Sequence, residues 1–170
     1  MFGIKSKCTV IHTAISDFPL LLRDEARSTL LPAEIIGSHL HNVWLISTGE
    51  LNKNKNYETA IDAVAEFNST HTTKIFYVIV SEGDLLQNIK EQVELKGLQD
   101  YVYFRGYVEN ARQYLLAFDM FLMTSLKEGL PFGLLEAGFA KLPCIASNVG
   151  GIPEVITDKK SGLLINPKNH

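Results

Sequence analysis

The sequence predicts an α/β fold in which a parallel sheet is covered by helices on both faces, as in Rossmann-like domains. Three observations lead to this prediction. Apolar runs of strand length recur along the chain and alternate with segments of helical periodicity. Within each run the residues are apolar throughout, which is typical of strands buried on both faces. No internal repeat and no low-complexity segment interrupts the pattern.

The first 42 residues are the least regular part of the pattern. Residues 8–15 predict a short strand or extended segment. A helix is expected over residues 20–31, with Pro19 near its first turn, where a missing amide hydrogen costs nothing. Residues 32–42 predict a loop, because Gly37 and Ser38 disfavour helix there.

From Val43 onward the alternation is regular. Strands are expected over 43–48, 74–80, 101–104, 119–125, 143–147 and 162–165. Helices are expected after Asn56 as N-cap, from Asp84 to a stop at Gly97, over 109–118, over 133–141, and from Pro153. In such sheets the ligand lies outside the carboxyl ends of the strands, so the loops after the strands are the candidate site.

Length and composition exclude several classes of protein. The chain has 170 residues, of which 46% are hydrophobic and 21% charged, which suits one globular domain. A formal net charge of −3 argues against a general binder of nucleic acids or anionic membranes. Neither the two cysteines, Cys8 and Cys144, nor the five histidines have metal-ligand spacing, so we expect free thiols and no metal. No apolar run could span a bilayer and no signal peptide opens the chain, so we expect a cytoplasmic protein.

The residues that suggest chemistry gather after the fourth expected strand. Glu128 follows that strand, and Glu136 lies eight positions later, in the expected first turn of a helix. Between them are the turn-forming residues Gly129, Pro131 and Gly133. A helix that starts behind such a turn directs free N–H groups at the loop and can bind phosphate. Glu136 could then accept the hydroxyls of a ribose, and Glu128 could hold a sugar or stabilise positive charge at its anomeric carbon.

These residues resemble the signature of the family-four retaining glycosyltransferases, enzymes with the GT-B fold. The segment EGLPFGLLE (128–136) is similar to that signature, in which seven residues separate two glutamates. Further segments follow in the family's order and spacing: GELNKNKNYETAIDA (49–63), VSEGDLLQNIKE (80–91), DYVYFRGYV (100–108), LEAGFAKLPCIASNVGGIPEV (135–155) and SGLLI (161–165). The resemblance covers about residues 43–167.

The resemblance implies the donor-binding C-terminal half of such an enzyme, with an interdomain segment at 1–42 and a nucleotide-sugar-binding domain at 43–170. It implies two catalytic residues, the phosphate lysine Lys55 and the sugar-contacting Glu128. The main chain around Arg105 would border the nucleobase, and its side chain would cover the base or face solvent. The implied donor-binding set is Gly49, Lys53, Arg105, Gly106, Gly129, Leu130, Pro131, Phe132, Gly133, Leu134 and Glu136.

The phosphate loop departs from the family pattern at two positions. Glu50 stands where the family usually has arginine, and its carboxylate would repel a diphosphate unless it points away or pairs, for instance with Lys53. Lys53 could instead supply the missing positive charge. Asn56 replaces a common glycine, a milder change because asparagine tolerates tight turns.

Each of these residues also has a structural explanation when it is taken singly. Glu136 could be a solvated helix charge, Glu128 a turn cap, and the lysines of the KNK run part of a solvated loop. The glycine pair before Pro153 could be only a turn between a strand and a helix. Their joint position at one edge of one sheet favours a nucleotide-sugar site.

The predicted function is to bind a nucleotide-diphosphate sugar for transfer with retention, in polysaccharide or glycoconjugate synthesis. The leaving diphosphate would be stabilised by Lys55 and the helix N-terminus, without cofactor or metal. The expected partner is an N-terminal acceptor domain, which could also bring peripheral membrane association; this chain alone would be inactive. No nucleic-acid partner is expected.

Three other functions are alternatives to this prediction. An epimerase or phosphorylase of the same two-domain architecture is one, although no segment resembles the surroundings of a pyridoxal lysine. A non-catalytic nucleotide-binding or protein-interaction module is another, and Glu50 makes it plausible. A dinucleotide-dependent dehydrogenase is disfavoured because no GxGxxG follows the first strand.

Overall fold

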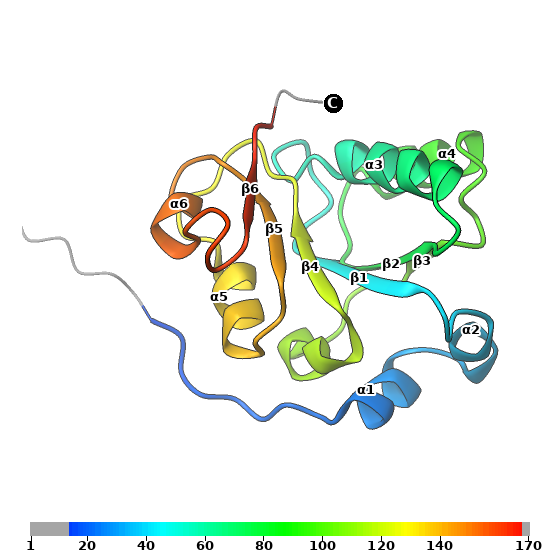
Figure 1. Cartoon of the computed structure of the whole chain (residues 1–170), viewed down its shortest axis with the longest axis horizontal. Coiled ribbons are helices and arrows are strands. Elements are labelled where there is room, and N and C mark those ends of the chain that lie inside the picture. Colours follow the sequence, from blue (N-terminus) through cyan, green and yellow to red (C-terminus); the bar gives the residue numbers. More distant parts are fainter. Residues whose placement is uncertain (1–13, 168–170) are drawn as a thin grey trace, which may run out of the picture.

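The computed structural model describes residues 14–167 and confirms the parallel α/β fold (Figure 1). In this part of the chain one sheet has the strand order β3-β2-β1-β4-β5-β6, and all of its paired strands are parallel. The strands are β1 (Val43–Thr48), β2 (Ile75–Val80), β3 (Val102–Phe104), β4 (Met120–Met123), β5 (Cys144–Ser147) and β6 (Leu163–Ile165). The strand order reverses between β1 and β4, so the loops that follow these two strands border the crevice where such sheets bind ligands.

Helices cover both faces of the sheet (Figure 1). One face carries α3 (Tyr57–Thr70) and α4 (Leu86–Leu95). The other carries α1 (Arg23–Leu30), the 3₁₀ helix η2 (Ala111–Ala117), α5 (Phe132–Phe139) and α6 (Ile152–Val155). Successive residues of a strand point to opposite faces, so Trp44 and Ile46 join one apolar core while Leu45 joins the other.

The N-terminal segment differs from the sequence prediction. The strand expected over 8–15 falls almost entirely outside the described residues, and Ala14 and Ile15 are not in a strand. Helix α1 begins at Arg23 rather than near Pro19, because the amide of Leu21 donates to the carbonyl of Gln113 and Leu22 is extended. The division of the chain at residue 42 stays a prediction.

The loop expected over 32–42 was wrong, since it contains helix α2 (Ala33–Ser38). The amide of Ile36 donates to the carbonyl of Pro32, and both Ile35 and Ile36 pack against the core. Partial burial of these two side chains therefore outweighs the low helix propensity of Gly37.

The helix expected over 109–118 is the shorter 3₁₀ helix η2. Asn110, which precedes it, has a φ of +53°, a left-handed conformation that cannot belong to a right-handed helix. The remaining expected helices and strands are found within a few residues of the predicted bounds. Among residues 14–167 no helix is long and apolar enough to cross a membrane.

Candidate functional site

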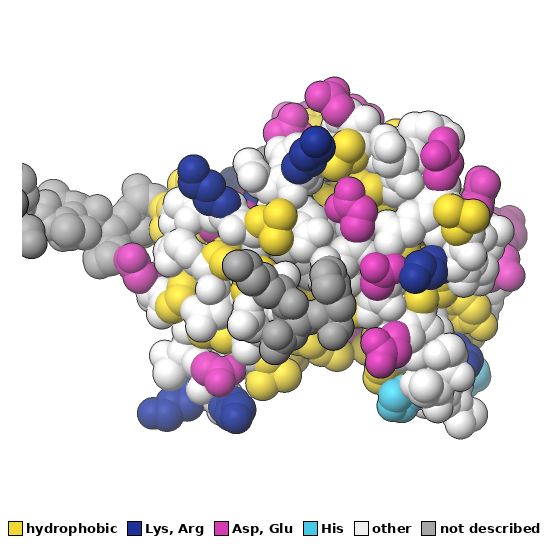
Figure 2. All heavy atoms as spheres, turned by 90° about the horizontal axis from the view of Figure 1, so that it is seen from above, with side chains coloured by type: hydrophobic (Ala, Val, Ile, Leu, Met, Phe, Trp, Pro, Cys, Tyr) yellow, Lys and Arg dark blue, Asp and Glu magenta, His cyan; other side chains and the backbone are white. Residues whose placement is uncertain are grey.

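The candidate site lies at the carboxyl edge of the sheet, which faces upward for β4 and β5 in Figure 1. Figure 2 looks onto this side of the molecule. On the visible face, Lys and Arg side chains are interspersed with acidic ones and form no continuous basic surface. Any binding of an anion at this edge must therefore come from local contacts and not from a broad positive field.

The two residues predicted to be catalytic are in direct contact. Lys55, from the loop after β1, places its Nζ 2.6 Å from Oε1 of Glu128, in the loop after β4. Ser125 donates from its Oγ to the same carboxylate oxygen at 2.7 Å. The Glu128 side chain is 10% exposed and that of Lys55 24% exposed, so the pair is largely shielded from solvent. A shielded charge pair is more sensitive to the loss of one partner than an exposed one.

The loop that carries Lys55 is fastened to the sheet through its main chain. The hydroxyl of Tyr57 donates to the carbonyl of Gly49 at 2.7 Å, and Ser81 donates to the same carbonyl. Thr124 Oγ1 lies 3.1 Å from the carbonyl of Lys55. Gly49 has a φ of +117°, and a Cβ there would lie 3.2 Å from Cε of Lys55. The backbone conformation therefore favours glycine, and a Cβ there would also crowd the lysine side chain.

The glycine pair 150–151 explains how the loop of Glu128 is held. A Cβ on Gly150 would lie 1.8 Å from the carbonyl oxygen of Glu128, and a Cβ on Gly151 would lie 2.0 Å from that of Gly129. The Gly151 amide also donates to the Glu128 carbonyl at 3.3 Å. The two loops thus pack backbone against backbone, an approach that no larger residue permits.

The N-terminus of α5 has the features of an anion site. Its N-cap is Pro131, without a side-chain cap. The amides of Phe132 and Leu134 donate to local carbonyls, whereas the Gly133 amide donates to no acceptor in residues 14–167. A Cβ on Gly133 would lie 3.1 Å from Oγ1 of Thr48, at the end of β1, so this helix start is close to the sheet edge. Unpaired amides at a helix start favour phosphate or another anion.

Glu136 belongs to a second polar group, away from the direct contacts of Lys55. Its Oε1 lies 3.9 Å from Arg112 of η2, too long for a hydrogen bond but close enough for charge attraction. The guanidinium of Arg112 is 4.7 Å from the ring centre of Phe18. Burial raises the pKa of the Glu136 carboxyl, and the charge of Arg112 opposes that shift.

One expectation for Glu136 was wrong. Helix α5 begins at Phe132, so Glu136 is the fifth helical residue and not part of the first turn. The helix dipole consequently stabilises its charge less than expected, and Arg112 supplies the nearby positive charge instead.

The Arg105 side chain is engaged within the domain. Its Nε donates to the carbonyl of Leu30 at 2.7 Å, at the C-terminal end of α1, and the side chain is partly exposed. Its place relative to a nucleobase stays a prediction. Gly106 has a φ of +75°, and the next amide, of Tyr107, donates to Oε1 of Glu82 at 3.3 Å. The amides of Arg105 and Tyr107 are therefore both bonded within the domain, to the carbonyl of Ile79 and to Glu82.

The departures in the phosphate loop have plain structural outcomes. The Glu50 side chain is exposed, and its carboxylate accepts a hydrogen bond from the side-chain amide of Asn52 at 2.9 Å. Lys53 is also exposed, and among residues 14–167 no ion pair joins it to Glu50. Asn56 does not cap α3: its φ of +51° is left-handed, and its amide donates to the hydroxyl of Thr59. An N-cap requires an extended backbone, whereas Asn56 supplies the turn that glycine would otherwise make.

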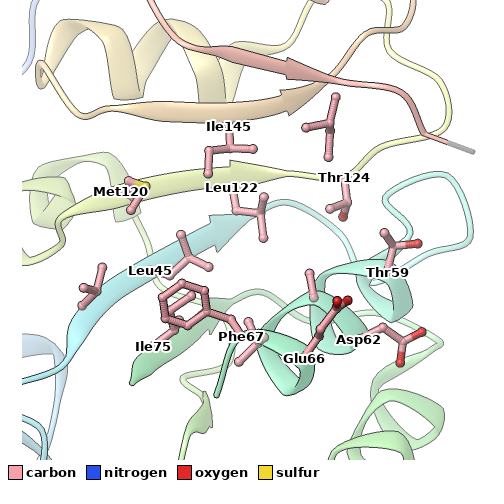
Figure 3. Close-up of a pocket in the computed structure, with 14 residues that line it drawn as sticks. Leu45, Thr59, Asp62, Glu66, Phe67, Ile75, Met120, Leu122, Thr124 and Ile145 are labelled. Atoms are coloured by element: carbon pink, nitrogen blue, oxygen red, sulfur yellow. The ribbon is translucent and has the colours of Figure 1, made fainter. Parts of the chain in front are cut away.

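An apolar hollow lies elsewhere, on the sheet face beside α3 (Figure 3). Its volume is about 340 Å³, and Leu45, Leu122, Ile145 and Phe67 point into it. It contains none of the predicted site residues. By contrast, the crevice beside Lys55, Thr48 and Ser125 holds about 10 Å³, room for one water at most. The predicted site residues lie at the edge of the sheet and not in the apolar hollow.

Two site residues were missed by the sequence reasoning. Ser125 and Arg112 each contact one of the two glutamates. Ser125 could have been found from its position at the end of the predicted strand 119–125, three residues before Glu128. Arg112 had no comparable signal, because its contact depends on how η2 packs against α5.

Among residues 14–167 no group of three or more His, Cys, Asp or Glu side chains could hold a metal ion.

The fold and this edge define a Rossmann-like domain with a ligand-binding crevice, and comparison with known proteins gives the family. Residues 35–170 match the family described as glycosyl transferases group 1. The chain belongs to this family, which confirms the resemblance found in the EGLPFGLLE segment.

Individual relatives agree with this assignment. The chain is 32% identical over 120 residues to the N-acetyl-alpha-D-glucosaminyl L-malate synthase of Bacillus anthracis, which covers 71% of this chain and 31% of that protein. Its fold is similar to that of the lipopolysaccharide outer core galactosyltransferase WaaB, with a TM-score of 0.73 and 21% identity over 98% of this chain and 44% of the other. It is also similar to the pneumococcal O-GlcNAc transferase GtfA solved with UDP and GlcNAc, with a TM-score of 0.68 and 26% identity over 74% and 25% of the two chains. The chain spans less than half the length of each of these relatives.

Proposed function

We propose that this domain binds a nucleotide-diphosphate sugar, and that the whole protein transfers the sugar to an acceptor with retention of anomeric configuration. Polysaccharide or glycoconjugate synthesis is the proposed setting, since relatives include an amylovoran biosynthesis glycosyltransferase of Erwinia amylovora. The acceptor would be held by a further, N-terminal domain. We therefore expect the 170-residue chain alone to bind nucleotide without efficient transfer.

The observation that carries the proposal is the contact between Lys55 and Glu128 beside the open N-terminus of α5. It brings a cation, a carboxylate and the unpaired amide of Gly133 to the crevice edge that such folds use for ligands. A diphosphate there would accept charge-assisted hydrogen bonds from Lys55 and from the loop amides.

Each group has a definite part in the proposed reaction. As the glycosidic bond breaks, negative charge grows on the leaving diphosphate, and Lys55 and the α5 amides would stabilise it. Glu128 would hold sugar hydroxyls or the positive charge that develops at the anomeric carbon. Glu136 would accept the ribose hydroxyls. Because these groups supply the needed charge, we propose that no metal is required.

The test separates the two glutamates by role. Glu136→Ala should weaken binding of free nucleotide and of nucleotide-sugar alike, by about 1–3 kcal/mol, the range for a hydrogen bond to a charged group. Glu128→Ala should leave free-nucleotide affinity unchanged, because this residue would touch only the sugar, and should lower transfer in the whole enzyme. Calorimetric titration against UDP, GDP and ADP and their sugar conjugates measures the binding part.

Two outcomes would contradict the proposal. Absence of binding to every nucleotide tested would favour the alternative, a non-catalytic interaction module. Equal weakening of free nucleotide by both substitutions would show that the two glutamates do not divide sugar and ribose between them. Circular dichroism and thermal unfolding of each variant check that the fold is intact.

A further inference from the structure

We infer that Ser125 is a positioning residue which, together with Lys55, fixes one oxygen of the Glu128 carboxylate so that the other oxygen is presented to the donor sugar. This inference rests on the proposed function and adds to it the group that orients the sugar-contacting carboxylate.

The two donors converge on a single atom. Lys55 Nζ is 2.6 Å and Ser125 Oγ 2.7 Å from Oε1 of Glu128. Within residues 14–167, no group donates a hydrogen bond to Oε2 of Glu128. This oxygen is also not a buried atom without a partner. The carboxylate is therefore asymmetric: Oε1 is held by the protein, while Oε2 is open and free to accept from a ligand hydroxyl.

Ser125 is suited to this role because it cannot move with the loop. It lies two residues after the end of β4 and is fully buried, with 0% exposure. Its neighbour Leu126 donates its amide to the carbonyl of Asn54 at 2.7 Å, which joins the loop after β4 to the loop after β1. The carbonyl of Glu128 is in turn packed against Gly150. A hydroxyl on such a fixed backbone limits the rotation of the glutamate side chain.

The serine becomes more important when a donor is bound. Lys55 also holds Glu128, but a bound diphosphate would compete for its ammonium group. As a neutral donor, Ser125 gains much less from contact with the diphosphate than the lysine does. Ser125 would then be the remaining protein donor to Oε1 and would keep the carboxylate aimed at the sugar.

The test compares Ser125→Ala with a matched serine. Ser147→Ala is the control, because Ser147 is also buried, lies at the end of β5, and has no hydrogen-bond partner for its hydroxyl within the described residues. Binding is measured by calorimetry with the wild-type chain's preferred nucleoside diphosphate and its sugar conjugate, starting with UDP and UDP-glucose. We expect Ser125→Ala to raise the dissociation constant for the nucleotide-sugar about five- to tenfold and to leave that for the free nucleotide within about twofold. Ser147→Ala should change neither.

A double-mutant cycle shows whether Ser125 acts through Glu128. In the Glu128→Ala background, Ser125→Ala should have no further effect on nucleotide-sugar binding. An effect that persists there, an equal loss for free nucleotide, or a result for Ser125→Ala that matches the control would each overturn the inference. If the wild-type chain binds no nucleotide at all, it is the proposed function that fails, and the two failures are thereby distinguished.

Discussion

Replacing Gly151 by alanine should destabilise the protein through a single clash in the site. Its φ of −82° and ψ of −1° are open to any residue, so the substitution introduces no backbone strain. The new Cβ would lie 2.0 Å from the carbonyl oxygen of Gly129, whereas ordinary contact begins at 3.4 Å. One of the two loops must therefore move by about 1.4 Å, and overpacking of this kind costs about 1–3 kcal/mol.

The control for this prediction is Gly138→Ala, in helix α5. A Cβ there would meet nothing within 4 Å, so alanine should stabilise the helix by about 0.5–1 kcal/mol. Urea unfolding of both variants measures the two free energies, and the two substitutions should shift the midpoint in opposite directions. Calorimetry should also show weaker nucleotide-sugar binding for Gly151→Ala, because the displaced loop carries Glu128. A Gly151→Ala protein as stable as wild type would refute the claim that these loops pack backbone against backbone.

Two further predictions concern charge. Lys55→Ala should weaken binding of a nucleoside diphosphate by about 1–3 kcal/mol in calorimetry; unchanged affinity would mean that Lys53 or no lysine contacts the phosphates. Nucleotide binding that needs an ionised Glu136 should decline as pH falls through the pKa of this carboxyl. Burial raises this pKa, and the charge of Arg112 lowers it. Arg112→Gln removes the opposing charge, so the acid limb of affinity against pH should move to higher pH; an unmoved limb would show that Arg112 does not act on Glu136.

The sequence by itself determined the fold class and the edge at which to look. Strand β1 was predicted at residues 43–48 and has these bounds, and the other strands differ by a few residues. The reason is that apolar runs and helical periodicity are local properties, written in neighbouring residues. The same locality explains the failure at α2, where packing of Ile35 and Ile36 against the core decided the conformation.

Only the tertiary structure decided which side chains meet. Lys55 and Glu128 are 73 positions apart and Arg105 reaches a carbonyl 75 positions away, so neither contact follows from spacing along the chain. Lys55 and Glu128 meet because the strand order reverses between β1 and β4, which brings the loop after the first strand beside the loop after the fourth. The sequence supplied the chemical groups at the edge, and the order of the strands determined which of them became partners.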